Sequence, residues 1–143
     1  MIQIAGVFIE DDAGQLVLQL RDDIPTISHP SHWSIWGGRV EEGESPIEAA
    51  AREVREELTL NVTHDALQFV TSGISISPPR EWYAFYWKAG AVVDHAIVTE
   101  GQKMGRFTLD EIKTGVLEGR PVIPWILRTF EEFRIWRERT RTA

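Results

Sequence analysis

The chain has 143 residues, of which 43% are hydrophobic and 26% charged, as expected for one globular domain over residues 1–143. Its formal net charge of −7 argues against binding to long nucleic acid, which requires a basic surface. The absence of cysteine excludes disulfides, thiolate zinc sites and cysteine nucleophiles. No apolar run approaches the roughly 20 residues of a membrane span, and the first residues lack a signal-peptide pattern. We therefore expect a cytoplasmic protein without a membrane partner, either a monomer or a homodimer.

The first part of the chain has the pattern of short β-strands. Residues 2–10 and 15–21 are apolar, β-branched runs separated by an Asp/Gly turn, which predicts a β-hairpin. Residues 22–32 contain two prolines and many turn-forming residues, and we predict an exposed loop there. Residues 33–36 predict a further short strand that leads into a pair of glycines.

A helix and two more strands are predicted in the middle of the chain. Ser45-Pro46, with a glutamate three residues after the serine, is typical of a helix start, and we predict a helix over residues 46–58. Residues 66–75 and 81–89 have strand patterns and are separated by two adjacent prolines.

The last third of the chain is predicted to be mainly helical. A short helix is expected over residues 108–113, capped by Thr108 or Asp110. A longer amphipathic helix is expected over residues 124–139. Strands that alternate with helices imply one mixed α/β domain.

The helix over residues 46–58 carries three glutamates on one side. Glu53, Glu56 and Glu57 have the spacing i, i+3 and i+4, and the apolar residues such as Ala50 and Val54 occupy an adjacent face. Three carboxylates this close repel one another unless a cation lies between them, and Mg²⁺ is the most plausible hard cation. The alternative is an ordinary solvated helix surface.

These glutamates are part of a longer spaced pattern. Starting at Gly38, Glu44 follows after five residues, Arg52-Glu53 follows after seven more, and a glutamate pair begins three residues after Glu53. This order closely resembles the Nudix box: Gly, five residues, Glu, seven residues, Arg-Glu, an aliphatic residue, any residue, Glu-Glu, any residue, Gly, an aliphatic residue. The predicted strand order and residues 101–112 also resemble the Nudix family.

The resemblance implies the Nudix fold, an α/β/α sandwich with a mixed β-sheet, and Mg²⁺-dependent hydrolysis of a nucleoside diphosphate linked to a moiety X. In such an enzyme Glu53, Glu56 and Glu57 would ligate Mg²⁺, with Mn²⁺ as the alternative ion. The carbonyl of Gly37 would add a ligand, as it does in some members, and Arg52 would orient a neighbouring glutamate. The ions would align a water for attack on phosphorus.

The resemblance also implies roles for residues around these ligands. Glu44 would support the geometry of the loop and helix. The general base would be Glu53 or Glu100, and members often use a glutamate near the latter position as a metal ligand; an ordinary loop carboxylate is the alternative for Glu100. Arg21 ends the second strand, where members often place a phosphate-contacting arginine, and a plain surface arginine is the alternative.

Three residues close to the box need separate comment. Thr59 stands where the family has glycine, a position that suits a left-handed residue, so we predict a differently ended helix and a small stability cost. Trp36 stands where many members have proline, and its ring would either stack on a base or ribose or pack in the core. Gly38 would let the backbone come close to a substrate.

The expected partner is a small nucleotide-type substrate, and the sequence does not identify X. Two rival hypotheses are a non-hydrolytic, isomerase-like enzyme of the same fold and a nucleotide-binding regulatory module. Because all four box glutamates are present, the hydrolase is the favoured hypothesis.

Overall fold

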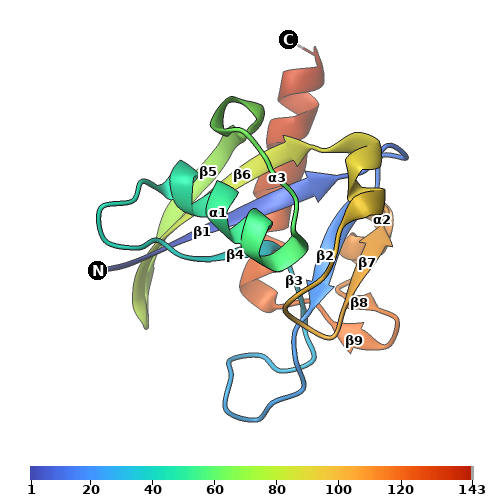
Figure 1. Cartoon of the computed structure of the whole chain (residues 1–143). Helices are drawn as coiled ribbons and strands as arrows, with labels where there is room; N and C mark the ends of the chain where they lie inside the picture. The colour runs from blue at the N-terminus through green and yellow to red at the C-terminus, as the bar shows by residue number, and fades with distance from the viewer. Residues whose placement is uncertain (143) are drawn as a thin grey trace.

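The computed structural model describes residues 1–142 and shows a mixed β-sheet with helices packed against it (Figure 1). The strand order is β3-β2-β1-β6-β5, with β4 also paired to β1 and β7 paired to β2. The strands of this sheet are β1 (Ile2–Glu10), β2 (Leu16–Leu20), β3 (Trp33–Ser34), β4 (Trp36–Arg39), β5 (Gln68–Ile76), β6 (Pro79–Lys88) and β7 (Lys103–Phe107). The helices are α1 (Pro46–Leu58), α2 (Leu109–Lys113) and α3 (Pro124–Thr142), with 3₁₀ turns η1 (His64–Ala66) and η2 (Gly90–His95) and a small hairpin of β8 (Val116–Leu117) and β9 (Arg120–Pro121).

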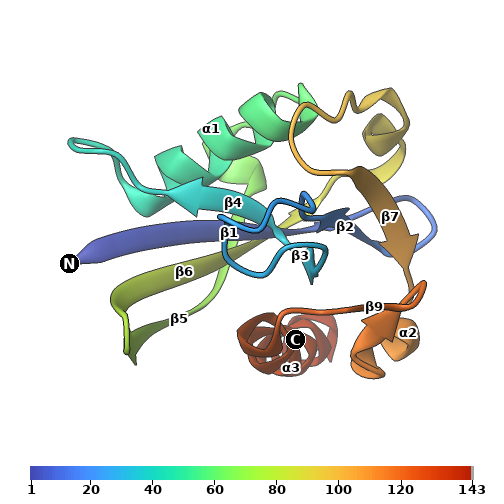
Figure 2. The ribbon, with the colours of Figure 1, turned by 90° about the horizontal axis from the view of Figure 1, so that it is seen from below.

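Strand β1 is the centre of the sheet. It pairs in parallel with β6 and antiparallel with both β2 and β4. Figure 2 shows α1 on one side of the sheet and α3 on the other. The predicted α/β/α sandwich with a mixed sheet is therefore confirmed, as is the predicted hairpin of β1 and β2.

Each helix covers its face of the sheet with apolar residues at helical spacing. Val54 and Leu58 of α1 are fully buried in the cluster on one face. On the other face, Phe130 and Phe133 of α3 are equally buried, and Phe8 of β1 stacks on Phe133 with ring centroids 4.6 Å apart. Burying side chains of this size stabilises the fold by about 1.5–3 kcal/mol each, and it fixes both helices against the sheet.

The start of α1 is the predicted one. The Ser45 hydroxyl accepts a hydrogen bond from the backbone N–H of Glu48, and the Glu48 carboxylate accepts one from the backbone N–H of Ser45. Pro46 occupies the first turn, where its missing N–H costs nothing. The short helix α2 is likewise capped by Thr108, one of the two predicted caps.

Two strand predictions need correction. Residues 33–36 do not form one strand, because β3 pairs with β2 while β4 pairs with β1, and the chain changes partner at Ile35. The second of the two adjacent prolines does not separate the later strands but begins β6, directly after a cis Ser77-Pro78 peptide bond. Proline is tolerated at the first residue of a strand, where no ladder donor is required.

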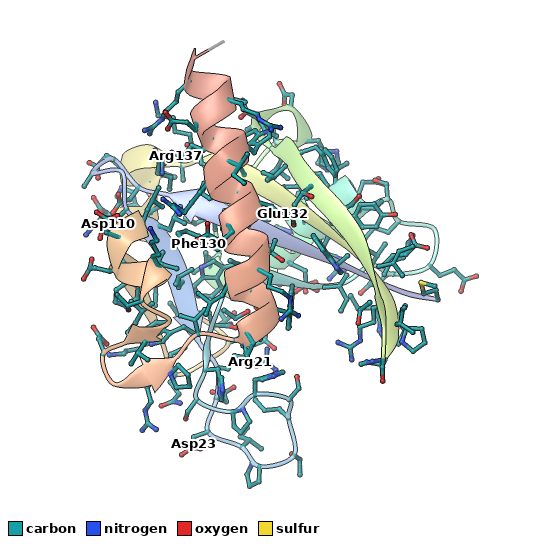
Figure 3. All side chains as sticks on the ribbon, turned by 180° about the vertical axis from the view of Figure 1, so that it is seen from behind. Arg21, Asp23, Asp110, Phe130, Glu132 and Arg137 are labelled. Carbon is teal, nitrogen blue, oxygen red and sulfur yellow. The ribbon has the colours of Figure 1, made fainter. Side chains whose placement is uncertain are left out.

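Helix α3 crosses the face of the sheet opposite α1 (Figure 3). Near its C-terminal end, Arg137 forms a buried ion pair with Glu10 at the end of β1. Tyr86 of β6 lies beside the pair, and burial together with the Glu10 carboxylate raises the pKa of Tyr86 to about 12. These contacts fix the end of α3 to the two central strands. Within residues 1–142, no helix has the length and apolar character needed to cross a membrane.

Candidate metal site

Two glycines let β4 approach the acidic side of α1. Gly37 has a φ of +152°, and a Cβ there would lie 2.1 Å from the carbonyl oxygen of Ala5, so a side chain does not fit. A Cβ on Gly38 would lie 2.6 Å from Oε1 of Glu53. The glycine pair therefore leaves the space that the Glu53 carboxylate occupies.

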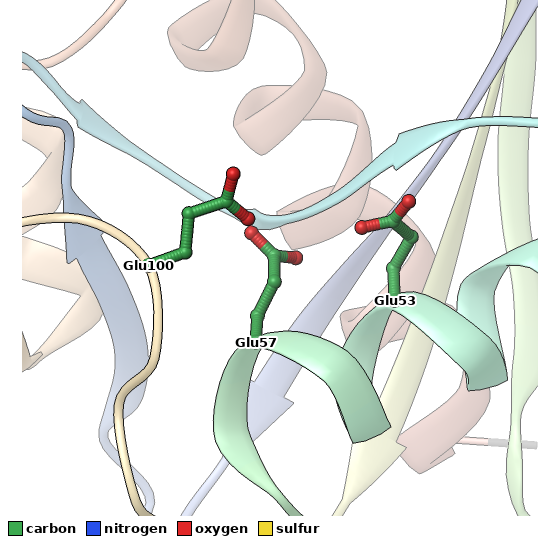
Figure 4. A group of neighbouring side chains, drawn as sticks. All are labelled: Glu53, Glu57 and Glu100. Atoms are coloured by element: carbon green, nitrogen blue, oxygen red, sulfur yellow. The ribbon is translucent and has the colours of Figure 1, made fainter.

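Three carboxylates meet beside the glycine pair (Figure 4). Glu53 and Glu57 extend from α1, Glu100 extends from the loop before β7, and one oxygen of each lies within 4.8 Å of the other two. Oxygens that share one octahedral Mg²⁺ lie about 2.9–4.2 Å apart, from its Mg–O distance of about 2.0–2.1 Å. Glu100 is exposed, so packing does not hold its carboxylate at the wider spacing.

Glu57 is the buried member of the group, with only 3% of its surface exposed. Its Oε1 accepts a hydrogen bond of 2.8 Å from the backbone N–H of Gly37, and its Oε2 accepts one of 3.2 Å from Nε2 of Gln19. Burial, followed by the nearby Glu53 carboxylate, raises the pKa of Glu57 to about 9. Burial also raises the pKa of Glu53. In the metal-free protein Glu57 therefore keeps its proton to a higher pH than an ordinary carboxyl group does.

Arg52 holds the acidic residues next to this group. Its Nη1 donates to Glu53 at 3.0 Å and to Glu56 at 3.1 Å, while its Nε and Nη2 donate to the two oxygens of Glu44 at 2.8 and 3.0 Å. The hydrogen bonds from Arg52 lower the pKa of Glu44 to about 2, and they raise the pKa of Arg52. Glu56 has an exposed side chain and lies beside Arg52, outside the group of three.

The loop that carries Glu100 is bonded to the C-terminal end of α1. The backbone N–H of Ile97 donates to the carbonyl of Leu58, and that of Thr99 donates to the carbonyl of Glu57 at 3.0 Å. The Thr99 hydroxyl also donates to the carbonyl of Glu56. These carbonyls belong to the last turn of the helix and have no partner within it. The bonds that complete the helix end therefore also place Glu100 beside Glu57.

Thr59 ends α1 differently from the prediction. It adopts the left-handed conformation itself, with φ 59° and ψ 29°, and its backbone N–H bonds to the carbonyl of Arg55. The predicted change of helix ending was therefore wrong: threonine takes the conformation that suits the family glycine. Its hydroxyl donates to the carbonyl of Ile97 at 3.1 Å, which offsets part of the backbone strain.

The two side chains predicted to contact substrate lie in different surroundings. Arg21 is partly exposed at the end of β2, and its Nε donates to the carbonyl of Ser28 in the loop over residues 22–32. Trp36 is fully buried, and its indole N–H donates to the carbonyl of Val17. The packing alternative for Trp36 therefore agrees with its burial.

The donors of this site suit a hard divalent cation. They are carboxylate oxygens, which Mg²⁺ and Mn²⁺ prefer, and they come from a rigid helix and from a loop bonded to that helix. A cation among Glu53, Glu57 and Glu100 would offset the burial and the repulsion that raise the pKa of Glu57. The residues present therefore fit the ion that the sequence resemblance implies.

Comparison with known families agrees with the fold and the acidic helix. The family model for the NUDIX domain matches residues 2–126 of the chain. The chain belongs to the Nudix family. The match includes the glycine pair, all of α1 and Glu100, so every residue of the candidate site lies within the Nudix domain.

Two curated relatives match part of this Nudix chain. The dihydroneopterin triphosphate diphosphatase of Escherichia coli K12 is 39% identical over 64 residues, which are 45% of this chain and 39% of that protein. A Bacillus subtilis protein provisionally named an 8-oxo-dGTP diphosphatase has the same identity over the same lengths. The matched segment is therefore only 39% of the length of each relative.

A solved structure resembles this Nudix chain over nearly its whole length. The solution structure of the E. coli ORF135 protein superposes with a TM-score of 0.74 and 25% identity, covering 96% of this chain and 91% of that one. This likeness supports the fold.

Gln19 is the site residue that the sequence does not indicate. It lies on β2, far from the box in sequence, and it is 4% exposed. It is the one polar residue in the otherwise apolar strand β2. That signal does not reveal its contact with Glu57, because the contact depends on how β2 and α1 pack.

Proposed function

We propose that the chain is a Mg²⁺-dependent pyrophosphohydrolase that cleaves a phosphoanhydride bond of a small nucleotide-type substrate, a nucleoside diphosphate linked to X, by water attack on phosphorus. The observation that carries this proposal is the meeting of Glu53, Glu57 and Glu100 in one group within a Nudix domain. The names of the two curated relatives, both diphosphatases, support the bond type. Mn²⁺ is the alternative ion.

The metal would be held by Glu53, Glu57 and Glu100, with Glu56 and the carbonyl of Gly37 added by the family resemblance. A bound divalent cation supplies charge for the phosphate oxygens and makes a coordinated water more acidic. The chain's own part is to keep these oxygens in place. Helix α1 supplies a rigid frame, and the raised pKa of Glu57 means that binding the ion releases a proton.

Arg52 and Glu44 would orient the ligands and not contact the substrate. The guanidinium bonds to both oxygens of Glu44, and the same group donates to Glu53 and Glu56. Since Glu44 stays ionised to a pH of about 2, the pair remains intact through the physiological range. The flexible glutamate side chains thereby lose freedom before the substrate binds, which lowers the cost of assembling the site.

A general base must accept the proton of the attacking water. Glu53 and Glu100 are the two candidates, because each places a carboxylate oxygen in the group without the burial that Glu57 has. Arg21 would contact a phosphate group from the end of β2, where its bond to Ser28 fixes its Nε. Gly38 would let the substrate come close to the backbone of β4.

The test is a rate measurement on a panel of nucleoside triphosphates, dinucleotides and nucleotide sugars with Mg²⁺. Glu57→Gln removes the charge of the central ligand and should lower kcat by at least about 100-fold, and Glu56→Gln should lower it as well. Glu132→Gln is the matched control, since Glu132 is exposed on α3 across the sheet (Figure 3). Turnover of Glu57→Gln as fast as the parent would contradict the proposal.

A further inference from the structure

Gln19 is the one side chain of β2 that connects the two halves of the metal site. Its Nε2 donates to Oε2 of Glu57 at 3.2 Å and to the backbone carbonyl of Glu100 at 3.1 Å. An amide nitrogen has two hydrogens, so one group serves both acceptors. One acceptor belongs to α1 and the other to the loop before β7.

The surroundings of Gln19 leave this amide little freedom. The side chain is 4% exposed, on a strand paired with both β3 and β7. Gly101 packs against it so closely that a Cβ on the glycine would lie 2.8 Å from Cγ of Gln19. Burial and the contact with Gly101 therefore restrict the rotamer of Gln19.

The hydrogen bonds to Glu57 leave it suited to bind a cation. The Gly37 N–H from β4 is bound to Oε1, and the Gln19 amide from β2 is bound to Oε2. A carboxylate offers about four lone-pair directions, so each oxygen keeps one for a metal. Two donors on different strands fix the plane of the carboxylate, as partners of metal ligands do in general.

We infer that Gln19 is a positioning residue of the metal site: it sets the orientation of Glu57 and its separation from Glu100. The inference rests on the proposed function, since it assumes that these two glutamates bind the ion. Gln19 itself is buried, so it would act through these glutamates and not on the substrate. Removing the Gln19 amide should weaken metal binding, and this effect should be distinct from any change in the free energy of unfolding.

The experiment measures the affinity of the chain for Mn²⁺ alone, by the electron paramagnetic resonance signal of the free ion. Gln19→Met keeps the length of the side chain and removes both donors, and we expect its Kd for Mn²⁺ to rise by about 10- to 100-fold. The free energy of unfolding without metal, from urea titration, is measured beside it. The KM for the nucleotide should change less than kcat, because the substrate contacts remain.

Gln3→Met is the matched control. Gln3 also lies on a strand, and its Nε2 donates to the carboxylate of Glu81 at 3.3 Å, away from the metal site. This variant should bind Mn²⁺ as the parent does. Should Gln19→Met fail to fold, Gln19→Asn takes its place, since it keeps an amide but is too short to reach both acceptors.

The outcomes are distinct. Weaker Mn²⁺ binding by the Gln19 variant, with the Gln3 variant unchanged, supports the inference. Equal affinity of the parent and the Gln19 variant overturns it and leaves the proposed function standing. A parent that binds no Mn²⁺ and hydrolyses no member of the nucleotide panel overturns both.

Discussion

Glu57 combines a buried carboxylate with two other carboxylates in contact range. Such a group is costly in a folded protein, because burial and repulsion both disfavour its charge. Two residues distant in the sequence offset part of this cost, because Gly37 and Gln19 each donate a hydrogen bond to the carboxylate. In the proposed function, a cation among the three carboxylates would offset the rest. The residue-scale predictions follow from this balance.

The metal-free protein should lose stability as the pH rises. The folded-state pKa of Glu57, about 9, lies above its ordinary value of 4.5, so the folded state holds a proton that the unfolded chain has released between these values. This contribution to stability is complete below a pH of about 4.5 and is lost as the pH rises through about 9. Glu57→Gln has no such titration, so the difference in Tm between parent and variant, followed by circular dichroism, should change over this range.

Magnesium should reverse this loss. Because the ion replaces the proton on Glu57, the rise in Tm caused by saturating Mg²⁺ should be larger near a pH of about 9 than near about 6. The measurement is thermal unfolding of the parent with and without the ion. An equal rise at both pH values would show that binding is not linked to this proton.

Thr59 should show the opposing effects of strain and hydrogen bonding. Thr59→Val keeps a β-branched residue at φ 59° and removes the hydroxyl bond to Ile97, so it should cost about 1–2 kcal/mol in the free energy of unfolding. Thr59→Gly loses the same bond but relieves the strain, so the change should stay within about 1 kcal/mol. Urea titration measures both, and kcat of the glycine variant should be nearly that of the parent. A large gain in kcat would show instead that threonine impairs the site.

At the scale of elements, the site is formed where α1, β4, β2 and the loop before β7 meet. Helix α1 is placed by its apolar face and by the capping box at Ser45, and the loop is placed by its bonds to the last carbonyls of that helix. Helix α3 covers the opposite face and is fixed by the pair of Glu10 and Arg137. Stability changes there should leave the metal site intact.

The buried pair of Glu10 and Arg137 gives an element-scale prediction. Arg137→Met leaves the Glu10 carboxylate buried and unpaired, which should cost about 3–5 kcal/mol in the free energy of unfolding. Glu10→Gln should cost a comparable amount for the same reason. The double variant should cost clearly less than the sum of the two, as coupled residues do. Additive losses in urea titration would mean that the two charges do not interact.

At the scale of the whole molecule, the sequence predicts best what depends on local spacing. The capping box and apolar face of α1, the hairpin of β1 and β2 and the mixed α/β class were all predictable from such spacing, whereas the α/β/α sandwich was implied by the family resemblance. The division of residues 33–36 between two strands was not, because it depends on which strands lie on either side. The same reason explains why Gln19 was missed.

The candidate site, too, contains residues that the sequence predicts and residues that it does not. The spaced glutamates of α1 predict a cation from charge repulsion alone, whereas Glu100 was indicated only by the family resemblance. The structure adds the reason for its position, namely the bonds of Ile97 and Thr99 to the helix end. Helical spacing predicts the contact of Glu56 with Arg52, four residues earlier, but it does not predict that Glu57, and not Glu56, joins Glu100.

The most direct test of the central claim is hydrolysis of the panel's best substrate in ¹⁸O-labelled water with Mg²⁺, with the products identified by mass spectrometry. The account predicts one ¹⁸O atom per turnover, bound to phosphorus in one product of a cleaved phosphoanhydride bond, and loss of the label in Glu57→Gln. Label on carbon, conversion of substrate without label, or labelled product from Glu57→Gln at the rate of the parent would contradict it.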